Sequence, residues 1–140
     1  RRAAGELARG VLLSEHWPLS SPPPLLIKGA DLNARLYQSR GLGGGRASSD
    51  WDLLLPEPDY HSVITAWRER FGEPTCPRSA RLPDESPYEL GFYIEGLLFE
   101  VHRAVCPPFY NQLSSEMIYA RAQKYQSSWG QEVLEPCSID

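Results

Sequence analysis

Two aspartates, Asp50 and Asp52, stand one residue apart at the start of the apolar run DWDLLLP, residues 50–56. Side chains two residues apart in a strand project from the same face of the sheet, so both carboxylates face one spot. Two carboxylates about 4 Å apart repel by on the order of 4 kcal/mol at an effective dielectric constant of about 20. A divalent cation would offset this repulsion, and Mg²⁺ commonly binds one or two carboxylates together with substrate phosphates. The plainer alternative is a pair of solvated acids at a strand end.

Three further residues, Glu100, Gly29 and Arg46, make the metal interpretation more specific, and Lys28 could add to them. Glu100 lies inside a second apolar run, where an unpaired charge is costly to bury. Gly29 stands where a strand is expected to turn into a helix, and backbone amides at such a turn can bind phosphate. Arg46 and Lys28 could reach phosphate oxygens. The ordinary alternatives are a simple strand–helix junction for Gly29 and solvent exposure for the two cationic side chains.

The three histidines carry less information. His102 follows Glu100 by two residues, so it shares the face of Glu100 and could orient that residue or a substrate. A hydrogen-bonded structural histidine is the interpretation we favour. His16 and His61 are interpreted as structural or exposed.

The elements that must position these side chains follow from periodicity and from turn residues. Tyr60, Val63, Ile64, Trp67 and Phe71 recur at helical spacing. Two aromatic and β-branched runs flank Glu95 and Gly96, which predicts a tight antiparallel hairpin. In chain order, we expect a helix at 2–14, a strand at 25–29, a helix at 30–37 and a loop at 40–49. A strand at 50–56, a helix at 58–72, a hairpin of strands at 88–94 and 97–105, and a helix at 114–126 follow.

This order predicts an α+β fold in which a small mixed β-sheet is flanked by helices. We divide the chain into an N-terminal helix and linker (1–20), a core (21–112) and the start of a C-terminal helical segment (113–140). The first residue is Arg rather than Met, and the last segment is short. We therefore expect a fragment of a longer chain.

Composition excludes several classes of protein. The 140 residues carry a net charge of −4, and their 14 Lys and Arg are scattered, so duplex nucleic acid is not an expected partner. Cys76, Cys106 and Cys137 are too few and too widely spaced for a disulfide framework or a zinc site. No apolar run is long enough to span a bilayer. These features predict a cytoplasmic protein without membrane partners.

The segments LLIKGADLNARLY, GGGRASSDWDLLLPEPDY and GLLFEVHRAV together resemble the nucleotidyltransferase fold of the DNA polymerase β type. Within that superfamily they are most similar to an uncharacterised bacterial group with Leu-Lys-Gly, Arg with Asp-x-Asp-Leu-Leu, and acid-x-His motifs. The resemblance covers residues 25–105. It implies that Asp50, Asp52 and Glu100 are catalytic metal ligands and that Gly29 belongs to the phosphate-binding turn. Ala30 replaces the serine that usually follows this glycine, which puts nucleotide affinity and turnover in question.

The expected function is transfer of a nucleoside monophosphate from a nucleoside triphosphate to an acceptor hydroxyl, with one or two Mg²⁺ ions. The resemblance leaves a peptide, a protein or a small molecule open as the acceptor. The alternative, which Ala30 favours, is a noncatalytic nucleotide-sensing or protein-interaction module, for example an antitoxin-like one. A simple acidic cation-binding domain is a third option.

The sequence also predicts how the metal-free protein should behave. The three carboxylates should raise one another's pKa, because each disfavours ionisation of its neighbours. Replacing Asp52 with Asn removes one charge at nearly constant shape. On this basis the variant is expected to leave the metal-free fold as stable as before or slightly more stable.

Overall fold

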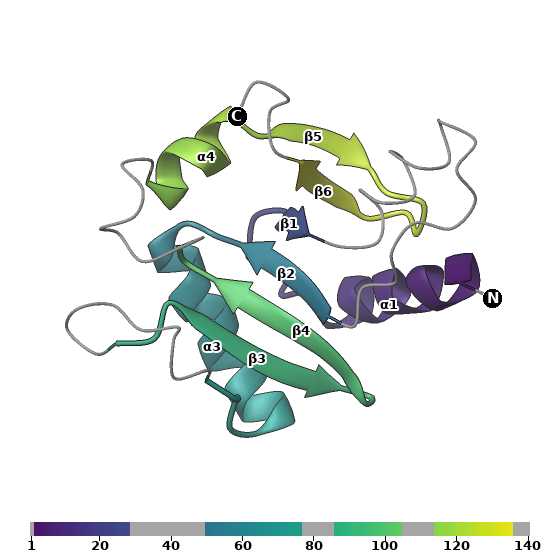
Figure 1. Cartoon of the computed structure of the whole chain (residues 1–140), viewed down its shortest axis with the longest axis horizontal. Helices are drawn as coiled ribbons and strands as arrows, with labels where there is room; N and C mark the ends of the chain where they lie inside the picture. The colour runs from purple at the N-terminus through teal and green to yellow at the C-terminus, as the bar shows by residue number, and fades with distance from the viewer. Residues whose placement is uncertain (1, 29–49, 77–85, 105–113, 136–140) are drawn as a thin grey trace.

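The computed structural model describes residues 2–28, 50–76, 86–104 and 114–135 of the chain. In chain order, the helices and strands of these residues are α1 (Arg2–His16), β1 (Leu25–Lys28), β2 (Asp50–Leu54), α3 (Glu57–Phe71), β3 (Glu89–Ile94), β4 (Leu97–His102), α4 (Ser115–Arg121), β5 (Gln123–Gln126) and β6 (Glu132–Glu135) (Figure 1). The predicted helix at 30–37 and the predicted loop at 40–49 lie outside the described residues. No helix of the described residues is long and apolar enough to cross a membrane.

The strands form one mixed six-stranded sheet in the order β3-β4-β2-β1-β6-β5. The pairs β2–β4 and β1–β6 are parallel, whereas β1–β2, β3–β4 and β5–β6 are antiparallel. Figure 1 shows α3 crossing behind β3 and β4, with α4 beside the opposite end of the sheet. The predicted α+β class, a mixed sheet flanked by helices, is confirmed.

The hairpin of β3 and β4 turns at the two residues that the sequence indicates. Glu95 and Gly96 have φ values of 51° and 78°, the positive angles that a two-residue type I′ turn requires. Ile94 then pairs with Leu97, and the ladder continues outward to Glu89 opposite His102. The turn therefore fixes which side chains of the two strands share a face.

One face of the sheet carries the main hydrophobic core, which α3 and the end of α1 cover. Alternate residues of β2, β3 and β4 point into it, among them the fully buried Trp51, Phe92 and Phe99. Trp67 of α3 packs edge-to-face against Phe92, with ring centroids 5.6 Å apart. The helix predicted at 58–72 is confirmed, and it ends where Gly72 adopts a φ of 85°.

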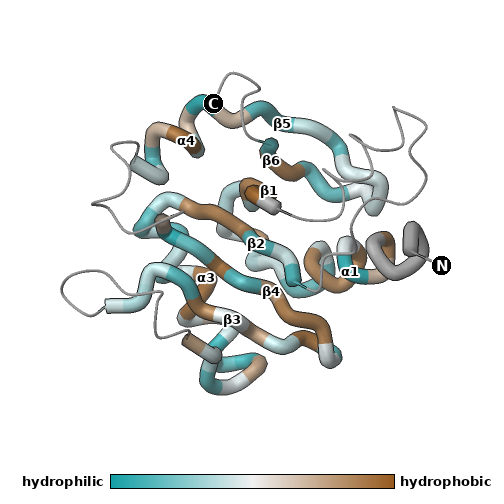
Figure 2. The backbone as a smooth tube through the Cα atoms, viewed as in Figure 1, coloured by the Kyte–Doolittle hydropathy of each residue, from teal (hydrophilic) through white to brown (hydrophobic). Residues whose placement is uncertain are grey.

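The other residues of the same strands point to the opposite face. Near β1 and β6 this face is apolar, where Leu25, Leu54 and Leu134 pack against Ile118 and Tyr119 of α4. Farther along β2 and β4 the residues become polar, and hydrophilic stretches alternate with hydrophobic ones along both strands in Figure 2. This change from apolar to polar places the candidate site on the face that α4 partly covers.

The C-terminal part of the chain differs from the sequence prediction. A helix is expected at 114–126, and Ser114 does cap α4 by accepting a hydrogen bond from Met117 N. The helix ends at Arg121, however, because Ala122 is extended, and residues 123–126 and 132–135 form strands instead. β5 is an edge strand whose residues are mostly exposed, so its sequence lacks the alternation that marks a strand.

Gly10 of α1 allows the turn between β5 and β6 to approach the helix. A Cβ added at Gly10 would lie 2.1 Å from the indole ring of Trp129, which itself packs against Trp51 at 5.2 Å. We expect Gly10→Ala to lower the free energy of unfolding by about 1 kcal/mol, because overpacking outweighs the gain in helix propensity. Urea denaturation measures this. In a Trp129→Leu background the same substitution should be neutral or stabilising, and an equal loss in both backgrounds would contradict the contact.

Candidate metal and catalytic site

Asp52 and Glu100 lie next to each other across two central strands. β2 and β4 are parallel and in register, so that Asp52 pairs with Glu100 and Asp50 pairs with Leu98. Asp52 is 1% exposed, whereas the Glu100 side chain keeps 16% of its surface exposed. The structure thus brings together two of the three carboxylates that the sequence singles out. Of the two, Glu100 is the one that solvent reaches.

His102 lies beside both carboxylates. Its Nε2 lies 2.8 Å from Asp52 Oδ1 and 3.7 Å from Glu100 Oε2, and its side chain is 6% exposed. The other ring nitrogen, Nδ1, lies 3.7 Å from Glu89 Oε2. One imidazole therefore faces three acidic side chains from three adjacent strands. The sequence places His102 on the face of Glu100 but gives no indication of its bond to Asp52.

The electrostatics of the cluster favour a positive charge on His102. Burial lowers the pKa of His102, but the hydrogen bonds to Asp52 and Glu100 and the charge of Glu89 outweigh it and raise the pKa to about 9. The hydrogen bond from His102 lowers the pKa of Glu100, whereas burial and the neighbouring Asp52 raise it, leaving it at about 6. Positive charge on the imidazole thus partly compensates the carboxylates.

This pairing changes what is expected of one variant. Asp52 is not merely a destabilising charge in the metal-free protein, because its Oδ1 accepts a hydrogen bond from a buried histidine. Replacing it with Asn weakens a charge-assisted bond as well as relieving repulsion. The expectation that Asp52→Asn is neutral or slightly stabilising omits this bond, and a loss of stability is argued below.

The remaining predicted site residues divide into two groups. Asp50 starts β2 on the same face as Asp52, half-buried, but it does not belong to the group of close donor atoms formed by Asp52, Glu100 and His102. Lys28 ends β1, and its backbone pairs with Asp52. Gly29, Ala30 and Arg46 lie outside the described residues.

The donor set fits a divalent cation. Asp52, Glu100 and His102 each offer one ligand atom, and these atoms lie within 4.8 Å of one another. Carboxylate oxygens suit hard cations, while imidazole nitrogen suits first-row transition ions. A cation could replace the positive charge of the imidazolium without leaving the carboxylates uncompensated.

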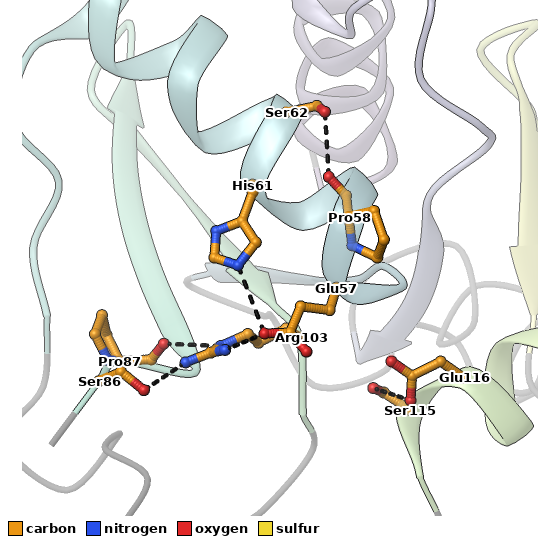
Figure 3. Close-up of polar contacts among 9 residues, drawn as sticks. All are labelled: Glu57, Pro58, His61, Ser62, Ser86, Pro87, Arg103, Ser115 and Glu116. Atoms are coloured by element: carbon orange, nitrogen blue, oxygen red, sulfur yellow. Dashed lines mark hydrogen bonds and ion pairs between the residues drawn. The ribbon is translucent and has the colours of Figure 1, made fainter. Parts of the chain in front are cut away.

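Arg103, which the sequence analysis does not single out, fixes the strand end next to the site. Its guanidinium donates to Glu57 Oε1 at 2.6 Å, to Ser86 Oγ at 2.7 Å and to Pro87 O at 3.1 Å. Figure 3 shows these groups on opposite sides of the guanidinium, with His61 reaching the same Glu57. Arg103 thereby ties the end of β4 to the start of α3 and to the segment before β3.

We expect Arg103→Met to lower the free energy of unfolding by about 1 kcal/mol, because the hydrogen bonds to the two partly buried acceptors are lost. The Glu57 side chain is 52% exposed, so Glu57→Gln should cost clearly less. Urea denaturation of both variants measures the difference. Equal losses would show that the ion pair, rather than the bonds to Ser86 and Pro87, carries the effect.

Comparison with known proteins identifies the fold but does not establish the activity. No family model matches the sequence, and no curated protein matches it either. A crystal structure of a Thermotoga maritima protein, described as a candidate nucleotidyltransferase, matches with a TM-score of 0.54 and 12% sequence identity. The match covers 96% of this chain and 79% of that one. The chain thus shares the fold of a candidate nucleotidyltransferase, and the resemblance predicted from the sequence is confirmed at the level of fold.

Proposed function

We propose that the chain is a metal-dependent nucleotidyltransferase, which transfers a nucleoside monophosphate from a nucleoside triphosphate to an acceptor hydroxyl. The observation that carries the proposal is the in-register carboxylate pair, Asp52 and Glu100, at the centre of a sheet with this fold. Asp50 is proposed as the third carboxylate, because it lies on the same face one strand repeat away.

The carboxylates would hold Mg²⁺, as one ion or two. When bound, the metal supplies Lewis acidity toward the acceptor hydroxyl and the departing pyrophosphate. The protein contributes fixed positions, since Asp52 and Glu100 belong to central strands of the sheet and lie in register. Such preorganised groups need little rearrangement when substrate binds.

Phosphate binding is assigned to the segment that follows β1. Lys28 pairs with Asp52 through the backbone, so the chain leaves β1 beside the carboxylates. We propose that the backbone at Gly29 and Ala30 binds the triphosphate, with Arg46 and Lys28 contributing positive charge. The acceptor remains open among a peptide, a protein and a small molecule.

The bond between His102 and Asp52 favours a second candidate function. A histidine with a pKa of about 9 already supplies the carboxylates with a positive charge. Together with Ala30 in place of serine, this favours a noncatalytic module that senses nucleotides or binds a protein partner while keeping the fold. In that case the buried cluster serves stability instead of catalysis.

Incubation with each labelled nucleoside triphosphate and Mg²⁺, scored for pyrophosphate release and for labelling of the protein, separates the two candidates. The enzyme hypothesis predicts release that Glu100→Gln abolishes and that Glu69→Gln, at an exposed position of α3, leaves unchanged. Nucleotide binding without release for any of the four nucleotides would favour the noncatalytic module. Release that survives Glu100→Gln would contradict the proposed site.

A further inference from the structure

We propose that His102 is itself a ligand of the bound cation, so that Asp52, Glu100 and His102 form a mixed nitrogen and oxygen site. Such a site prefers a first-row transition ion, for which Mn²⁺ is the probe, to Mg²⁺. The inference rests on the proposed function for the place of the cation. It goes further by adding a nitrogen ligand and by naming the class of ion.

The geometry of the donor atoms carries the first step. His102 Nε2 lies 2.8 Å from Asp52 Oδ1 and 3.7 Å from Glu100 Oε2. Neighbouring ligands that each lie about 2.1 Å from an ion in an octahedral shell are about 3.0 Å apart. The separation between His102 and Asp52 is already close to this value. Glu100, the most exposed of the three, has to approach His102 Nε2 by less than about 1 Å on the same scale, and all three donor atoms lie within 4.8 Å of one another.

The second step comes from the other ring nitrogen. A histidine that binds a metal through one nitrogen usually donates its second N–H to a carboxylate or carbonyl, which fixes the ring and increases its basicity. Glu89 lies directly opposite His102 in the β3–β4 ladder, with Oε2 3.7 Å from Nδ1. At this distance Nδ1 makes no hydrogen bond, so Glu89 has to approach by about 0.7 Å to orient the ring, whereas Nε2 already faces the two carboxylate ligands.

The third step concerns the choice of ion. Mg²⁺ takes oxygen ligands almost exclusively and gives up its water reluctantly. Imidazole nitrogen binds first-row transition ions more strongly than it binds Mg²⁺. Among these ions the affinity rises from Mn²⁺ to Cu²⁺. Asp52 and His102 are 1% and 5% exposed, so an ion that reaches both must exchange water for the nitrogen. This exchange penalises Mg²⁺ more than Mn²⁺.

Pulsed electron paramagnetic resonance on the Mn²⁺-loaded protein, without nucleotide, tests the nitrogen ligand directly. The chain has three histidines, and His16, His61 and His102 all lie in the described part of the structure. We expect a ¹⁴N coupling in the unaltered protein that persists in His61→Gln and disappears in His102→Gln. Tightly bound Mn²⁺ without this coupling, or a coupling that survives His102→Gln, would overturn the inference. Because the main spectrum uses the unaltered protein, its result does not depend on the variant folding.

Calorimetric titration with MnCl₂ or MgCl₂ alone gives the second readout. The preference for Mn²⁺ over Mg²⁺ should fall by at least about tenfold in His102→Gln, the scale on which metal affinity responds to a lost partner. An unchanged preference, or no stoichiometric Mn²⁺ binding, would overturn the inference. Nucleotidyl transfer with Mg²⁺ in a protein without nitrogen coupling would uphold the proposed function alone, whereas coupling without transfer would uphold the metal site alone.

Discussion

Asp52→Asn is expected to lower the free energy of unfolding of the metal-free protein by about 2 kcal/mol at neutral pH, because the acceptor of the hydrogen bond from the His102 imidazolium loses its charge. Asp52 is 1% exposed and accepts from His102 Nε2 at 2.8 Å. Among the residues that the structure describes, the buried imidazolium then faces Glu100 and Glu89, each 3.7 Å away. Relief of repulsion between Asp52 and Glu100 offsets part of this loss.

Glu100→Gln is the matched control for that experiment. Glu100 is partly exposed, and its pKa is raised to about 6, so its charged form is less favoured in the folded protein. Removing this charge should change the free energy of unfolding by less than about 1 kcal/mol. Both variants should nevertheless lose the stabilisation that a divalent cation gives. Urea denaturation with EDTA and with Mn²⁺ measures both effects, and a neutral Asp52→Asn in EDTA would mean that the bond to His102 does not support the fold.

The second large effect is a loss of stability of the metal-free protein as the pH rises from 6.5 to about 9. The lower limit is the ordinary pKa of a histidine, and the upper limit is the raised pKa of His102 in the folded protein. The folded state binds this proton more tightly than the unfolded state, so its contribution is complete below pH 6.5 and disappears above pH 9. The difference between the two pKa values corresponds to on the order of 3 kcal/mol. In the described part of the chain, Asp52, Glu100 and Glu89 are the acidic groups that face this proton.

Urea denaturation in EDTA at several pH values across this window measures the loss, and His102→Gln should flatten the profile. Glu100, with a pKa of about 6, titrates below the window. Tyr60 and Tyr119 titrate above it, because burial raises the pKa of each to about 12. A profile with the same slope in His102→Gln would assign the pH dependence to another group.

The parts of the fold that local pattern determines could be predicted from the sequence. The helical spacing from Tyr60 to Phe71 and the Glu95–Gly96 turn correspond to α3 and the β3–β4 hairpin. β5 and β6 could not be predicted in this way. Gln123–Gln126 consists of residues that suit a helix surface, and it becomes a strand by pairing with β6, which in turn pairs with β1. Pairing between distant segments leaves little trace in a local window.

The candidate site likewise combines features that the local sequence pattern predicts with features that depend on pairing between distant strands. The alternation of side chains places Asp50 with Asp52, and Glu100 with His102, on common faces. Counting outward from the turn would also have placed Glu89 opposite His102, a signal that the sequence analysis did not use. The bond between Asp52 and His102 could not be inferred, since it depends on β2 and β4 being parallel neighbours in register. Sheet order is a property of the whole fold.

Anomalous diffraction from crystals grown with Mn²⁺ and a nonhydrolysable nucleoside triphosphate analogue tests the central claim most directly. The account predicts a Mn²⁺ peak within coordination distance of carboxylate oxygens of Asp52 and Glu100, with the triphosphate on the side of the chain that follows β1. The bond of 2.8 Å between His102 Nε2 and Asp52 Oδ1 should then be replaced by shared contact with the ion. Ordered Mn²⁺ and nucleotide elsewhere, with that hydrogen bond intact, would contradict the account.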